Sequence, residues 1–222
     1  MALKIFCLSD THGCAPARVS DQGVTAWLHA GDIFNVGSAS EAREMKTWSL
    51  SRRAPIFSVR GNHDCGDGMK SLDTRFRDIS GKVVEVAPRL FVAGIGWSGM
   101  ICFDIPGEAE LETVCKKILL RAKMQMTADD SCILLTHYPA WTPKLFPTQT
   151  DKWGRMFDCI RELIDALRPL AVIQGHIHQL FMEHAIYRTY AFESMIAFPG
   201  PGGAVLYVDL ETRKASFAPW IE

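Results

Sequence analysis

The sequence lacks paired cysteine motifs, long apolar runs and any excess of basic charge, and each absence narrows the class of protein. Its cysteines are odd in number and include no C-x-x-C pair. This favours free thiols in a reducing compartment over a disulfide framework or a structural zinc site. No apolar stretch approaches the roughly 20 residues that cross a bilayer. The first apolar run, interrupted at Asp10, is too short for a secretory signal. We therefore expect a cytoplasmic protein.

The charge balance also limits the partners. The 222 residues carry a formal net charge of −1, with 48% hydrophobic and 22% charged residues, which is ordinary globular composition. There is no basic field for an anionic membrane and no extended track for nucleic acid. We expect one domain over residues 1–222 that acts on a small substrate. The pattern does not indicate an oligomeric state.

Polar side chains follow several short apolar runs, each of which predicts a buried strand. The runs at 3–8, 24–30, 56–59, 131–135 and 170–173 all end in residues that can bind metal ions. If these strands are parallel neighbours, their carboxyl ends meet at one edge of a sheet, where chemistry is usually located. The residues at the five strand ends are Asp10 and His12; Asp32; Asn62, His63 and Asp64; His137; and His176 and His178.

The remaining pattern predicts helices and hairpins around these strands. We expect helices at 38–53, 108–126 and 157–167, the first opened by a capping box of Ser38 and Glu41. Hairpins are expected at 82–93 and 204–218, a further apolar run lies at 194–198, and a loop with a short helix is expected at 65–80. Residues 94–99 predict a glycine-rich loop that lacks the spacing of a dinucleotide-binding motif. The proline-rich segment 138–153 predicts a surface loop over a pocket, to which Trp141 contributes.

Each polar cluster alone has an ordinary explanation, since aspartate is common in turns and a single histidine is common in loops. Their recurrence at five strand ends instead predicts a shared metal site. Oxygen and nitrogen ligands without thiolates suit Mn²⁺, which we favour, or iron or Zn²⁺. The ligands are too many for one ion. They suffice for two ions that share one carboxylate and lie about 3.5–4 Å apart, a spacing that activates water and clamps a phosphoryl group.

The ordered motifs Asp-x-His, Gly-Asp, Gly-Asn-His-Asp, His and Gly-His-x-His over residues 9–178 resemble those of the calcineurin-like metallophosphoesterases. The resemblance implies a four-layer α/β/β/α sandwich with two mixed β-sheets, and attack on phosphorus by a hydroxide that bridges two divalent ions. His63 would protonate the leaving oxygen, and Asp64 would hydrogen-bond the loop rather than bind metal. The implied ligands are Asp10, His12 and His178 for one ion, Asn62, His137 and His176 for the other, and Asp32 as the bridge.

The sequence departs from the protein-phosphatase branch of that family after Gly-Asp. Asn35 and Val36 stand where that branch has aspartate and arginine. Asn35 can still hydrogen-bond His63, but Val36 removes a phosphate-binding arginine. Arg60 resembles a phosphate-contacting arginine of that branch, although a surface role fits it equally well. With one arginine fewer, the site favours small phosphodiesters over dianionic monoesters.

Three alternatives remain beside a phosphodiesterase. One is a phosphomonoesterase, including a protein phosphatase. Another is a scaffold that kept the fold and lost the chemistry, which the complete ligand set disfavours. A nuclease for long DNA is disfavoured by the charge balance. We expect His29, which precedes Gly31-Asp32, to be a packed or supporting residue rather than a ligand.

Overall fold

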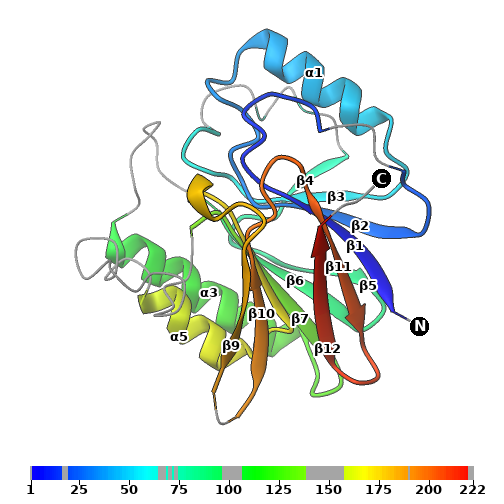
Figure 1. The fold of residues 1–222 in the computed structure, drawn as a ribbon. Helices are drawn as coiled ribbons and strands as arrows, with labels where there is room; N and C mark the ends of the chain where they lie inside the picture. The colour runs from blue at the N-terminus through cyan, green and yellow to red at the C-terminus, as the bar shows by residue number, and fades with distance from the viewer. Residues whose placement is uncertain are drawn as a thin grey trace.

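Two mixed six-stranded β-sheets form the centre of the protein (Figure 1). The structure is a computed structural model that describes residues 2–16, 20–64, 69, 72, 75–96, 107–138, 158–189 and 191–219. The first sheet has the strand order β12-β11-β1-β2-β3-β4 and the second has the order β5-β6-β7-β8-β10-β9. In the first sheet, β1 to β4 are parallel neighbours that reach one edge, and β11 and β12 add antiparallel pairs at the other. In the second sheet, parallel pairs lie in the middle and antiparallel pairs lie at both edges. Parallel neighbours end at a common edge, which brings their following loops together.

The first sheet contains six strands with these bounds: β1 Leu3–Leu8, β2 Val24–His29, β3 Ile56–Ser58, β4 Phe76–Asp78, β11 Ala204–Asp209 and β12 Lys214–Pro219. The second sheet contains the other six: β5 Val83–Ala87, β6 Leu90–Ile95, β7 Ser131–Thr136, β8 Ala171–Gln174, β9 His184–Arg188 and β10 Glu193–Ala197. The helices are α1 Ala39–Leu50, α3 Glu108–Gln125, α5 Asp158–Leu167 and the 3₁₀-helix η1 His178–Leu180.

The layers follow from strands that are apolar on both faces. In β1, Ile5 and Cys7 pack between the two sheets, whereas Phe6 and Leu8 pack toward α1. Side chains alternate along a strand, so a continuous apolar run supplies both faces. A third cluster joins the second sheet to α3 and α5. Three apolar clusters thus separate four layers, and Figure 1 shows α1 on one outer face and α3 and α5 on the other. The predicted α/β/β/α sandwich is confirmed.

Most predicted elements form close to their expected positions. The capping box that begins α1 is present: Ser38 Oγ accepts from Glu41 N at 3.3 Å, and the Glu41 carboxylate accepts from Ser38 N at 3.0 Å. Both predicted hairpins form, as β5–β6 and β11–β12.

Two strands were not predicted. β4 lies within 65–80, where we expected a loop and a short helix, and β9 lies in a stretch with no expected element. The predicted glycine-rich and proline-rich loops fall largely outside the described residues, as does Trp141. No described helix is both long and apolar enough to cross a membrane.

Candidate metal centre

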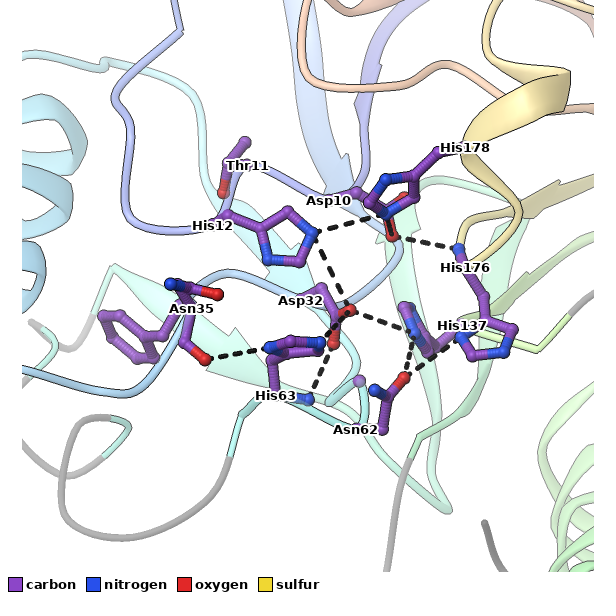
Figure 2. A network of polar contacts seen from close by, with 12 residues as sticks. Asp10, Thr11, His12, Asp32, Asn35, Asn62, His63, His137, His176 and His178 are labelled. Atoms are coloured by element: carbon purple, nitrogen blue, oxygen red, sulfur yellow. Dashed lines mark hydrogen bonds and ion pairs between the residues drawn. The ribbon is translucent and has the colours of Figure 1, made fainter. Parts of the chain in front are cut away.

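The carboxyl ends of strands from both sheets meet at one polar cluster, which Figure 2 shows from close by. Loops after β1, β2 and β3 contribute from the first sheet, and loops after β7 and β8 contribute from the second. Short contacts connect all seven predicted ligands and His63 within this cluster. The members are Asp10, His12, Asp32, Asn62, His63, His137, His176 and His178.

One side of the cluster contains the first predicted ligand group. His12 Nε2 lies 3.3 Å from His178 Nε2, and His178 Nε2 lies 3.6 Å from Asp10 Oδ1. Asp32 Oδ2 lies 4.0 Å from His12 Nε2 on the same side. Asp10, His12 and His178 each present a donor atom within 4.8 Å of the others. This spacing allows the three side chains to hold one cation.

The other side contains the second predicted group. Asn62 Oδ1 lies 3.0 Å from both His137 Nε2 and His176 Nδ1. Asp32 Oδ2 is 3.5 Å from His137 Nε2. The same carboxylate oxygen therefore faces both groups, as a bridging ligand must. Figure 2 shows Asp32 between them, with contacts to His12, His63 and His137.

The donor set fits divalent cations. Neighbouring ligands about 2.1 Å from an octahedral ion are about 3 Å apart, close to the 3.0–3.6 Å separations just given. The main-chain nitrogen of His176 donates to Asp10 Oδ1, and that of His63 donates to Asp32 Oδ1. These two bonds fix the orientation of both carboxylates. Asp10 Oδ2 is buried with no hydrogen-bond partner among the described residues. A buried, unpartnered carboxylate oxygen is unfavourable unless a cation or donor meets it.

Backbone strain is concentrated at the predicted ligands. Asp10, His12, Asp32 and His176 all have positive φ, between 47° and 72°. Such left-handed conformations cost non-glycine residues of order 1–3 kcal/mol each and occur mainly at functional sites. Backbone bonds between loops hold two of these residues: Asp10 N donates to Gly31 O and His12 N to Asp32 O.

The glycines of the motifs allow these loops to approach each other closely. A Cβ on Gly61 would lie 2.1 Å from Asp32 Oδ1, and one on Gly175 would lie 2.6 Å from Asp10 Oδ2. A Cβ on Gly31 would lie 2.6 Å from His137 Nδ1. Each motif glycine therefore makes room for a predicted ligand supplied by a different strand end.

Hydrogen bonds to backbone carbonyls orient two of the histidines. His137 Nδ1 donates to Ala30 O at 2.9 Å, so its Nε2 is the nitrogen that faces Asn62 and Asp32. His63 Nδ1 donates to Asn35 O at 2.8 Å, and its Nε2 lies 3.9 Å from Asp32 Oδ2. Asn35 was expected to reach His63, but its main-chain carbonyl makes this bond. At metal sites, the ring nitrogen of a histidine that does not face the metal typically donates its N–H to a carbonyl or carboxylate oxygen.

Burial and neighbouring charges shift several ionisations in the cluster. Burial alone would raise the pKa of Asp10, but hydrogen bonding with His178 and the proximity of His137 outweigh it and hold the pKa at about 2. The bond to Asp10 raises the pKa of His178. Burial lowers the pKa of His176 to about 4. Asp10 is thus ionised and His176 neutral at neutral pH, the forms that bind cations.

Asp64 stabilises the loop, as expected, and its hydrogen bonds go to the backbone rather than to ligand atoms. It is buried, and its two oxygens accept hydrogen bonds from Phe34 N and Gly61 N, both at 2.9 Å. Burial, followed by the nearby charge of Asp32, raises the pKa of Asp64 to about 7. This carboxyl joins the loop after β2 to the loop after β3.

Arg60 lies beside the cluster in sequence, with its guanidinium engaged elsewhere. Its Nε donates to Asp78 Oδ2 at 2.7 Å, and its side chain is 45% exposed. Its predicted contact with substrate phosphate therefore stays a prediction.

Sequence reasoning did not identify Thr11 as part of the site. Thr11 stands between Asp10 and His12, is buried, and contacts both His29 and the Ile33 carbonyl. His29 is fully buried and bonds Thr11 rather than a ligand, in agreement with its expected supporting role. The apolar β2 pattern alone carries no signal for this pairing.

Comparisons with known proteins identify the fold and the family. The family model for calcineurin-like phosphoesterase matches residues 3–180. TT1561 of Thermus thermophilus is structurally similar at 16% identity, with 99% of each chain covered and a TM-score of 0.66. The phosphopantetheinyl hydrolase PptH from Mycobacterium tuberculosis is similar at 10% identity, with 90% of each chain covered and a TM-score of 0.54. No curated protein sequence matches significantly. The family match covers most of the chain, and the chain belongs to the calcineurin-like phosphoesterase family.

Proposed function

We propose that this protein is a dinuclear metal-dependent phosphoesterase that hydrolyses small phosphodiesters in the cytoplasm. The observation that carries the proposal is the position of Asp32, whose Oδ2 faces His12 at 4.0 Å and His137 at 3.5 Å, one from each ligand group. Two divalent cations, with Mn²⁺ favoured, would lower the pKa of water and neutralise charge on the phosphoryl group. The odd number of cysteines and the lack of a C-x-x-C pair in the sequence support a reducing compartment.

His63 is the proposed proton donor to the leaving oxygen. Its Nδ1–H donates to the Asn35 carbonyl, so Nε2 is the ring nitrogen that faces the cluster and can reach a substrate there. The main-chain nitrogen of His63 donates to Asp32 Oδ1 at 2.9 Å, which fixes the base of the side chain relative to the bridging carboxylate. A donor held by two bonds is positioned for proton transfer in the transition state.

The charge around the site supports diesters over monoesters. Val36 is 63% exposed and uncharged where the protein-phosphatase branch has arginine. Arg60 is paired with Asp78, which offsets part of its charge. A phosphomonoester dianion carries one more negative charge than a diester and gains more from arginine contacts. The name of PptH, a hydrolase for phosphopantetheinyl groups, also supports phosphoester chemistry on this fold.

The test compares aryl phosphodiester and aryl phosphomonoester hydrolysis by protein loaded with Mn²⁺. We expect a kcat/KM at least about tenfold higher for the diester, and loss of both activities in Asp32→Asn and His63→Ala. Higher activity on the monoester would instead identify a phosphomonoesterase. If calorimetry detects no uptake of Mn²⁺, Fe²⁺ or Zn²⁺ by wild-type protein, the scaffold alternative replaces the enzyme.

A further inference from the structure

A buried hydrogen-bond chain lies behind the first ligand group. His29 Nε2 lies 3.0 Å from Thr11 Oγ1, and Thr11 Oγ1 donates to Ile33 O at 3.2 Å. His29 is the last residue of β2, Thr11 separates Asp10 from His12, and Ile33 follows Asp32. The Thr11 side chain therefore connects the loop after β1 both to the end of β2 and to a main-chain carbonyl of the loop after β2.

The direction of these bonds follows from the available protons. A threonine hydroxyl has one proton, and the Ile33 carbonyl can only accept, so Thr11 donates to Ile33. The bond between His29 and Thr11 must then be donated by His29 Nε2–H. This tautomer leaves His29 Nδ1 as a bare acceptor, and Nδ1 is buried with no hydrogen-bond partner among the described residues. Burial lowers the pKa of His29 to about 3, which keeps the ring neutral.

The connected loops carry three of the strained predicted ligands. Asp10, His12 and Asp32 have φ values of 53°, 47° and 54°. Backbone bonds from Asp10 N, His12 N and Gly13 N also cross between the two loops. Ile33 O accepts from both Gly13 N, at 2.7 Å, and Thr11 Oγ1. The Thr11 hydroxyl therefore adds a side-chain bond to the three backbone bonds that join the two loops. In Figure 2 the Thr11 side chain lies outside the group of ligands that the dashed lines join.

We propose that Thr11 and His29 are positioning residues that fix Asp10 and His12 relative to Asp32 and thereby set the affinity of the first ligand group for a divalent cation. The inference rests on the proposed function only in its use of that group as a cation site. The hydrogen bonds of the two side chains run to each other and to the Ile33 carbonyl, not to a ligand donor atom. Their effect is transmitted through the backbone conformation at Asp10, His12 and Asp32. Supporting residues of this kind typically change metal affinity about 10–100-fold when they are removed.

The test is Mn²⁺ binding, measured by titration calorimetry on metal-free protein, together with the unfolding temperature of the metal-free form. Thr11→Val keeps the shape and removes the hydroxyl, whereas Thr11→Ser keeps the hydroxyl. We expect Thr11→Val to weaken binding of one of two Mn²⁺ ions about 10–100-fold, and Thr11→Ser to stay within about threefold of wild type. Thr113→Val removes a hydroxyl that bonds the Ala109 carbonyl on α3, away from the site, and should leave Mn²⁺ affinity unchanged.

A second pair of variants tests the His29 end of this hydrogen-bond chain. His29→Phe keeps an aromatic ring without a donor, and His29→Gln keeps an N–H donor. We expect His29→Phe to weaken Mn²⁺ binding as much as Thr11→Val does, and His29→Gln to keep most of the wild-type Mn²⁺ affinity. In the double variant Thr11→Val with His29→Phe, the loss should be smaller than the product of the two single losses, because both remove the same bond.

The outcomes separate this inference from the proposed function. Wild-type Mn²⁺ affinity in a folded Thr11→Val protein overturns the inference, even if its unfolding temperature falls, since a purely structural role would lower stability alone. An equal loss in Thr11→Ser and Thr11→Val overturns it too. Uptake of Mn²⁺ by wild type without diester hydrolysis would refute the proposed activity and leave this inference standing. Absence of any cation uptake by wild type would refute both.

Discussion

Replacement of Gly61 by alanine should displace the bridging carboxylate. A Cβ at this position would lie 2.1 Å from Asp32 Oδ1 and 2.4 Å from the Asp32 main-chain nitrogen. Non-bonded heavy atoms prefer separations of about 3.5 Å or more, so one loop must move by about 1 Å relative to the other. The nitrogen cannot rotate away as a flexible side chain could. Metal ligands tolerate errors of only about 0.2 Å, and a 1 Å displacement can lower turnover about 100-fold.

We expect Gly61→Ala to weaken Mn²⁺ binding and to lower diester kcat/KM, each by about 100-fold. Calorimetry and steady-state kinetics measure these effects, and circular dichroism checks that the variant is folded. Gly202→Ala is the matched control, because its Cβ meets no atom within 4 Å and its φ is not positive. A folded Gly61→Ala protein that binds Mn²⁺ as wild type does would refute the reasoning that close loop approach sets the ligand geometry.

Three further outcomes follow from contacts described above. Asn35→Ala should retain diester activity within about threefold, since the main-chain carbonyl of residue 35 holds His63; a 100-fold loss would assign the role to the amide side chain. Ser38→Ala should lower the free energy of unfolding by about 1 kcal/mol in urea titrations through loss of the α1 cap, whereas no change would show that Glu41 suffices. Because the native pKa of His29 is about 3 and its ordinary value is 6.5, the unfolded chain binds one more proton between these limits. Stability of the metal-free protein should therefore fall as pH drops below 6.5, by up to about 1.4 kcal/mol per pH unit from this residue, and His29→Gln should remove that contribution; an unchanged slope would contradict it.

The fold was largely predictable because its central strands are apolar on both faces and are followed at once by glycine or polar residues. β4 and β9 were missed for local reasons. β4 has only three residues, too few for a period, and β9 carries His184 and Arg188 in a stretch without turn signals. Such edge strands are fixed by pairing with neighbours more than by their own composition.

The candidate site was predictable in its residue types, and the three glycine contacts explain why the motifs include glycine. The partner of His63 was not predictable, because a main-chain carbonyl leaves no trace in the sequence. The link between Thr11 and His29 was equally hidden. It depends on the distance between two residues 18 positions apart in the sequence, which only the packed sheet determines.

The origin of the ligands has a consequence for how the two sheets stay together. Asp10, Asp32 and Asn62 extend from the first sheet, whereas His137 and His176 extend from the second. Cations held by both sets would bind the intact sandwich more tightly than either sheet alone, so their binding free energy adds to inter-sheet cohesion. Amide hydrogen exchange in β1, β2, β7 and β8 should then slow together when Mn²⁺ is added. Chelation would loosen the sandwich first at this end, while the opposite end keeps its apolar packing.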